Sequence, residues 1–155
     1  RDGFVELLLL LLHERFVRAE ASSWWPYLEL LPAVEELQSP YFLDDARLAA
    51  ILPGSELPAA ARRLRASIRS AFERLVPPLL AQVPFFEKMR SALTFDRYEW
   101  ATIVLNTRSI WWRGERHLVP MLDLVNCHAG QPADEVAQAE IFGACALVAL
   151  QRRPA

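Results

Sequence analysis

The sequence has 155 residues but only two cysteines, a single lysine and no long uninterrupted apolar segment. Cys127 and Cys145 are too few for a disulfide framework, and such sparse use is typical of a reducing compartment. We therefore expect an intracellular location, in the cytoplasm, the nucleus or an organelle matrix. The cysteines and the histidines His117 and His128 also lack the short paired spacing of zinc ligands, so the sequence predicts no metal site.

The hydrophobicity pattern of the sequence also contains no convincing membrane-spanning or signal segment. The candidate, Val5–Leu12, is interrupted by Glu6 and followed at once by His13 and Glu14. It is well short of the roughly 20 apolar residues that a spanning helix needs, and no small-residue cleavage site follows it. The segment favours a buried helix, and we expect no membrane partner.

A strong charge of one sign is the third absence. The formal net charge is -2, with 23% charged residues, so nothing in the overall charge attracts a polyanion and we expect no nucleic acid partner. Lys88 is the only lysine, and the abundance of arginine beside alanine is explained by GC-rich coding as well as by guanidinium chemistry. Arg62, Arg65 and Arg69 share one helix face and are predicted to form a solvated surface.

The residues that are present suit one globular domain, because 53% of them are hydrophobic. Apolar residues at helical spacing predict a first helix over Asp2–Phe16, with Asp2 as its cap, that is central and buried nearly all round. A long helix from Pro58 should end or kink near Val76, before Pro77–Pro78. Further helices are predicted to start at Pro26, Asp45 and Thr94.

The end of the chain has a different character. Residues 108–119 are typical of two short extended pieces around a turn at Gly114, and Ile141–Leu150 is another β-like run. Helices followed by a strand-bearing end indicate an α+β fold, predominantly α, rather than α/β. The tryptophans are predicted to pack in the core, although on a strand Trp111 and Trp112 must face opposite sides.

One short segment gathers several reactive groups. From Asp123 to His128 the sequence offers a carboxylate, an amide, a thiol and an imidazole directly after an apolar stretch. Cys127 beside His128 does not favour a nucleophile pair, because adjacent side chains usually diverge. On composition alone, Cys127 and Cys145 are best interpreted as small buried hydrophobic residues.

Four motifs follow one another along the chain. They are Ser23-Trp24-Trp25-Pro26-Tyr27-Leu28 with Leu31-Pro32, then Ser39-Pro40-Tyr41-Phe42, then Tyr98-Glu99-Trp100-Ala101 leading into Thr107-Arg108-Ser109, and finally Leu118–Asn126. In this order they resemble the SET-domain protein methyltransferases, in the branch of the Rubisco large-subunit and actin-histidine methyltransferases. A long helical insertion interrupts the SET fold in that branch. The last motif is the most specific of the four.

The resemblance implies that S-adenosylmethionine is the cofactor. It implies that Asn126 and the backbone around it hold the cofactor, that Asp123 shapes the turn, and that Arg108 lies near the cofactor's charged end. The implied cofactor-binding residues are Arg108, Asp123, Leu124, Val125, Asn126 and Cys127. Cys127 stands where the family usually has histidine, so it would contribute mainly its backbone. Judged without the family, Arg108 is also compatible with a surface arginine, and Asp123 with a helix cap.

The resemblance also implies a tyrosine hydroxyl near the reacting nitrogen, from a part of the SET fold beyond the asparagine turn. Tyr27, Tyr41 and Tyr98 all precede that turn, so the catalytic residue is unknown and the tyrosine is expected outside this chain. The glycine-containing strands that precede the insertion are not found either. We interpret residues 1–107 as the helical SET insertion and residues 108–155 as a partial SET core with the cofactor-binding turn, together an incomplete fragment.

The function expected from these features is S-adenosylmethionine-dependent protein-lysine N-methyltransferase activity. The protein substrate is expected to be non-histone and to offer lysine, or alternatively histidine. Methyl transfer from a sulfonium is an in-line displacement that depends mainly on positioning and desolvation. The alternative is a catalytically inactive SET-like helical module that binds proteins, which Cys127 and the missing tyrosine favour. An unrelated helical adaptor would require the ordered motifs to be coincidental.

Overall fold

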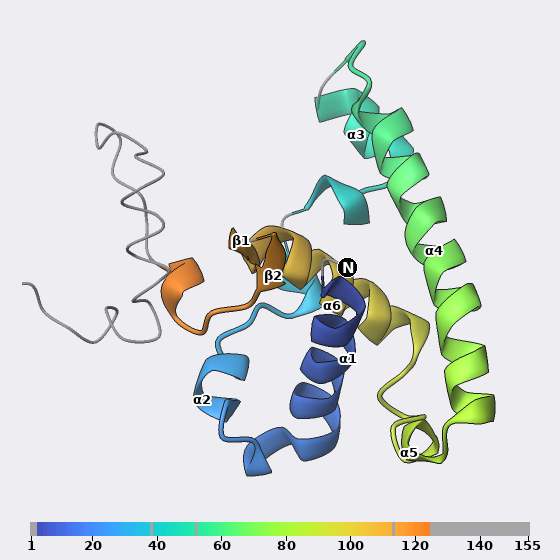
Figure 1. Cartoon of the computed structure of the whole chain (residues 1–155). Helices are drawn as coiled ribbons and strands as arrows, with labels where there is room; N and C mark the ends of the chain where they lie inside the picture. The colour runs from blue at the N-terminus through green and yellow to red at the C-terminus, as the bar shows by residue number, and fades with distance from the viewer. Residues whose placement is uncertain (1–2, 38, 52, 113, 125–155) are drawn as a thin grey trace, which may run out of the picture.

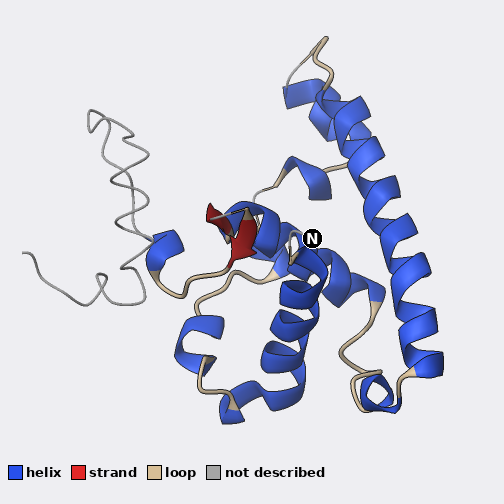
Figure 2. Cartoon of the chain, in the orientation of Figure 1, coloured by secondary structure: helices blue, strands red, loops and turns tan. Residues whose placement is uncertain are grey.

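The computed structural model describes residues 3–37, 39–51, 53–112 and 114–124 (Figure 1). This part of the chain is predominantly helical and has one short antiparallel hairpin near its end (Figure 2), which confirms the coarse fold expectation. The predicted β-like run Ile141–Leu150 lies outside the described residues. The elements are α1 (Phe4–His13), α2 (Trp25–Leu28), α3 (Asp45–Ile51), α4 (Leu57–Gln82), α5 (Pro84–Glu87), α6 (Phe95–Arg108), β1 (Ile110–Trp112) and β2 (Glu115–His117).

Helix α6 is the centre of the core. As predicted, Thr94 caps its start, where the hydroxyl accepts a hydrogen bond from the backbone N–H of Arg97 at 3.4 Å. The helix packs against both α1 and α4, and Ala101, Val104 and Leu105 are fully buried. Because the helix is enclosed in this way, the position of its last residue, Arg108, is fixed by the core.

Helix α1 presents one face to the core. Leu8 and Leu12, one turn apart, are fully buried, whereas Leu10 is 44% exposed. The expectation of burial nearly all round is therefore wrong for Leu10, because α6, the main packing partner of α1, covers one side of the helix. The helix begins at Phe4, and its cap is Gly3 in a left-handed conformation with φ 68° rather than Asp2, which is outside the described residues.

Helix α4 passes through its two internal prolines. The sequence predicts an end or a kink before Pro77 and Pro78, but the helix continues to Gln82. Proline has a helix-compatible φ, and what it removes is an N–H donor. Packing on either side offsets that loss, since Val76 is 2% exposed and Leu80 packs against the core. In the described part of the chain no helix is both long enough and apolar enough to cross a membrane.

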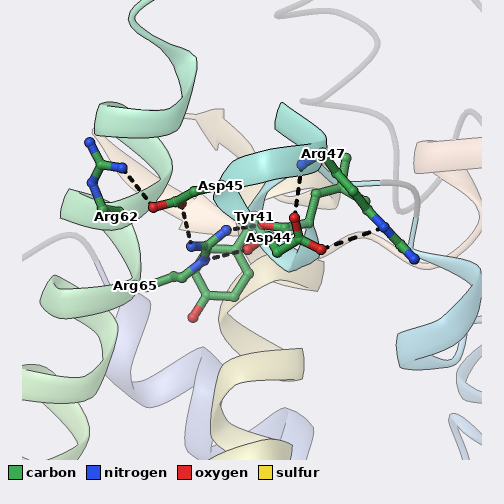
Figure 3. A network of polar contacts seen from close by, with 7 residues as sticks. Tyr41, Asp44, Asp45, Arg47, Arg62 and Arg65 are labelled. Carbon is green, nitrogen blue, oxygen red and sulfur yellow. Dashed lines mark hydrogen bonds and ion pairs between the residues drawn. The ribbon is translucent and has the colours of Figure 1, made fainter. Parts of the chain in front are cut away.

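The basic face of α4 holds the segment before α3 in place. The guanidinium of Arg65 donates to the carbonyl oxygens of Tyr41, at 2.8 Å, and Leu43, and it pairs with Asp45 at 3.3 Å (Figure 3). Arg62 pairs with the other oxygen of Asp45 at 2.6 Å. The predicted solvated surface is therefore wrong for Arg65, because the segment folds back onto α4 and its carbonyl groups need donors.

The hairpin pairs β1 with β2 antiparallel around the predicted turn at Gly114. Trp111 is opposite Arg116, and Gly114 in the turn has φ 79°, which suits glycine. Trp111 is 54% exposed while Trp112 is partly buried, so the two tryptophans differ in environment as the strand period requires. Arg116 connects the hairpin to the start of α1, with its guanidinium 5.2 Å from the centre of the Phe4 ring.

Candidate functional site

Two residues that the sequence predicts to bind a cofactor meet in the structure. Arg108 is the last residue of α6, and Asp123 lies in a short 3-10 helix, Leu122–Leu124, after the hairpin. Arg108 Nη1 donates to Asp123 Oδ2 at 2.5 Å. The Asp123 side chain is 4% exposed and that of Arg108 is 23% exposed. A carboxylate buried this deeply needs a charged partner, and Arg108 supplies it.

A third residue of this cluster, Tyr27, was not predicted from the sequence as a site residue. Tyr27 lies in α2 and is 4% exposed. Burial raises the pKa of its hydroxyl well above the ordinary value, and the charge of Asp123 raises it further, while Arg108 acts in the opposite direction. The signal for Tyr27 was present in the Trp-Pro-Tyr motif, but a tyrosine in an aromatic cluster is most simply interpreted as packing.

Two atoms of the cluster are buried without a hydrogen bond of regular geometry in the described part of the chain. They are the hydroxyl of Tyr27 and Oδ1 of Asp123. Oδ1 is the carboxylate oxygen that Arg108 Nη1 does not contact. One atom is a donor and the other an acceptor, so the two groups are complementary.

The ion pair adjoins an open cavity of about 510 Å³. Arg108 and Asp123 form part of its wall, and further lining residues come from α6 and from the segment between α2 and α3. Trp100 fixes that segment, because its indole Nε1 donates to the Pro32 carbonyl oxygen at 2.8 Å. The lining residues are Pro32, Glu36, Leu37, Ser39, Pro40, Ile103, Thr107, Arg108 and Asp123.

The remaining predicted site residues are only partly covered by the structure. Leu124 ends the 3-10 helix that holds Asp123, whereas Val125, Asn126 and Cys127 lie outside the described residues. Among the residues that were described, no group of histidine, cysteine, aspartate and glutamate side chains is arranged to hold a metal ion. The geometry therefore brings together Arg108, Asp123 and Tyr27 beside a cavity, with chemistry suited to a ligand that has both charged and hydrogen-bonding groups.

Comparison with known proteins gives one informative match. The human protein N-lysine methyltransferase SETD6 is 36% identical to this chain over 90 residues. The similarity supports the SET family and a methyltransferase. The match covers 58% of this chain and 19% of the length of that relative. No family profile matches the chain, and no solved structure matches it.

Proposed function

We propose that the protein carrying this chain is an S-adenosylmethionine-dependent protein-lysine N-methyltransferase, of the Rubisco large-subunit and actin-histidine methyltransferase-like branch, with a non-histone substrate. The chain supplies one wall of the cofactor site. The observation that carries the proposal is the 2.5 Å ion pair between Arg108 and Asp123 beside a cavity. It joins two motifs of the SET resemblance, in a chain similar to an N-lysine methyltransferase.

The chemistry of the described residues fits the proposed cofactor. S-adenosylmethionine has a carboxylate, an ammonium group, ribose hydroxyls and an adenine ring. Arg108 has guanidinium N–H donors besides the one directed at Asp123, and a guanidinium suits a carboxylate. The cavity of about 510 Å³ falls within the range of roughly 300 to 1,000 Å³ that is usual for small-molecule sites.

The bound cofactor supplies an electrophilic methyl group on a sulfonium. The contribution of this chain is to bind and orient it. Arg108 is held by α6, Asp123 is held by Arg108, and both line the cavity. Leu124, Val125, Asn126 and Cys127 follow Asp123 directly and complete the proposed turn. Fixed positions of this kind lower the barrier of an in-line displacement without any acid or base from this wall.

The test uses the complete protein that carries this chain. Calorimetry should show that it binds S-adenosylmethionine, and a lysine-containing non-histone peptide array should be methylated on lysine and not on matched peptides with arginine in that place. Peptides with histidine as the acceptor decide between the two substrate classes. The chain alone should bind the cofactor weakly at best, because it would hold only one wall of the site.

Variants connect the result to the site. Arg108→Lys keeps a cation for Asp123 but removes the planar donor pair, so it should weaken cofactor binding about tenfold or more while the protein stays folded. Arg62→Ala, which changes an exposed arginine on α4, should leave binding unchanged. A folded complete protein that neither binds the cofactor nor transfers a methyl group would contradict the proposal and favour the inactive interaction module.

A further inference from the structure

The Tyr27 hydroxyl is deeply buried, and it makes no hydrogen bond of regular geometry with the described residues. The ring of Tyr27 belongs to the hydrophobic core, and phenylalanine would fill that space equally well. A buried hydroxyl without a partner costs free energy, so its presence calls for a reason beyond packing. Oδ1 of the neighbouring Asp123 carboxylate is also buried, and no described residue donates to it with regular geometry.

We propose that Tyr27 is a positioning residue for the Arg108–Asp123 pair, and that its hydroxyl donates to Asp123 Oδ1. This inference rests on the proposed function for the role of the pair, but the hydrogen bond itself does not depend on it. With Oδ2 taken by Arg108 and Oδ1 by Tyr27, the carboxylate is held from both sides. Its plane then cannot rotate without breaking one of two bonds in a buried place.

The positioning of Asp123 affects a ligand through Arg108. Arg108 is 23% exposed and lines the cavity, and one of its nitrogens is committed to Asp123. A carboxylate that cannot rotate restrains the Nη1 end of the guanidinium, and so limits the directions in which the other N–H donors of Arg108 can point. Tyr27 acts only through Asp123 and is not among the residues that line the cavity.

Electrostatics agree with this arrangement. A tyrosine hydroxyl is protonated at neutral pH, and burial and the charge of Asp123 both raise the pKa of the Tyr27 hydroxyl further. A protonated hydroxyl can donate to Oδ1, whereas a tyrosinate next to a buried carboxylate would repel it. The charge of Arg108 lowers the pKa of Tyr27, but its effect is smaller than those of burial and of Asp123, so the pKa stays raised.

The chain contains a matched control for this hydroxyl. Tyr41 is also 4% exposed and its hydroxyl also donates to a carboxylate, that of Glu99. The Tyr41–Glu99 pair is formed by residues that do not line the cavity. Tyr27→Phe and Tyr41→Phe therefore remove the same chemical group from similar surroundings, one inside the proposed site and one outside it.

The first measurement needs no ligand. Nitrogen-15 NMR of the Arg108 guanidinium reports its rotation about the Nε–Cζ bond, and Tyr27→Phe should speed this rotation severalfold while Tyr41→Phe leaves it unchanged. The second is calorimetry with S-adenosylmethionine on the complete protein. There Tyr27→Phe should weaken binding about tenfold, the usual effect of a hydrogen bond to a charged group, and Tyr41→Phe should change it less than about twofold.

The outcomes separate the two proposals. Unchanged Arg108 rotation in Tyr27→Phe overturns the positioning role, whatever the cofactor does. Faster rotation in a protein whose wild type does not bind S-adenosylmethionine supports the hydrogen bond and contradicts the proposed function. Equal losses of cofactor affinity in both phenylalanine variants would show a general effect of buried hydroxyl removal, and would also overturn the positioning role.

Discussion

Asp123 and Arg108, 15 residues apart in the chain, form an ion pair in which the acid is buried more deeply than the base, with side chains 4% and 23% exposed. The two partners are therefore not equivalent. If the arginine is removed, a buried charge is left without a counterion. If the acid is neutralised, the guanidinium can still reach water.

The first prediction follows from that asymmetry. Arg108→Ala should lower the free energy of unfolding by about 3 kcal/mol, because it leaves the Asp123 carboxylate buried and uncompensated. Asp123→Asn keeps the shape and should cost about 1 kcal/mol. Urea denaturation followed by circular dichroism measures both values. Equal losses, or a larger loss for Asp123→Asn, would mean that the carboxylate is hydrated in solution.

The second prediction concerns the tyrosines at high pH. Burial raises the pKa of the Tyr27 hydroxyl above its ordinary value of 10.0, and Asp123 raises it further. Because the folded-state pKa is the higher one, this contribution to stability is fully present below about pH 10 and is lost as the pH rises through the folded-state pKa. Stability should thus fall in alkaline solution.

Replacing the acid separates the two causes. In Asp123→Asn the pKa of Tyr27 should move down toward 10.0 and stay above it, since burial remains. The ultraviolet absorbance of tyrosinate measures this titration. Tyr41, whose pKa is raised by burial and then by Glu99, should titrate as before and serves as an internal reference. An unchanged pKa of Tyr27 in this variant would mean that the charge of Asp123 does not act on the Tyr27 hydroxyl.

The third prediction compares two arginines of one helix face. Arg65→Ala removes donors from the carbonyl groups of Tyr41 and Leu43 and should cost about 2 kcal/mol. Arg62→Ala removes one exposed ion pair and should cost less than about 0.5 kcal/mol. Thermal unfolding distinguishes them. Similar small effects would show that water can replace the Arg65 guanidinium.

The fourth prediction tests the prolines within α4. Pro77 and Pro78 are exposed and remove backbone donors from a helix that continues past them. Pro78→Ala should therefore raise stability by roughly 1 to 3 kcal/mol. Pro84→Ala is the matched control, because Pro84 begins α5, where proline is well tolerated. A destabilised Pro78→Ala variant would show that the proline stabilises the protein by reducing the conformational entropy of the unfolded chain.

The sequence predicted those elements whose signals are local. The cap at Thr94, the short helix at Pro26 and the glycine turn of the hairpin each depend on residues within a few positions, and all three are confirmed. Continuation of α4 through Pro77 was not predictable in this way. It depends on packing of Val76 and Leu80 against residues that are distant in sequence.

The candidate site also contains residues that the sequence predicted and one that it did not. Arg108 and Asp123 were predicted from a family resemblance, which matches motifs in the sequence and needs no knowledge of their distance in space. Tyr27 precedes Asp123 by most of the described chain, and no periodicity or spacing connects the two. Their proximity is a property of the fold, as is the burial that changes the pKa of Tyr27. The cofactor roles of Val125, Asn126 and Cys127 stay predictions.

The contact of Arg116 with Phe4 has a consequence for how the chain folds. The two residues are at opposite ends of the described region, yet the Arg116 guanidinium lies over the Phe4 ring. On the ribosome, the first turn of α1 is made long before the hairpin that covers it. Closing so long a loop carries a larger entropic cost than the local helix contacts. The hairpin, and with it the Arg108–Asp123 pair, should therefore be among the last parts to assemble.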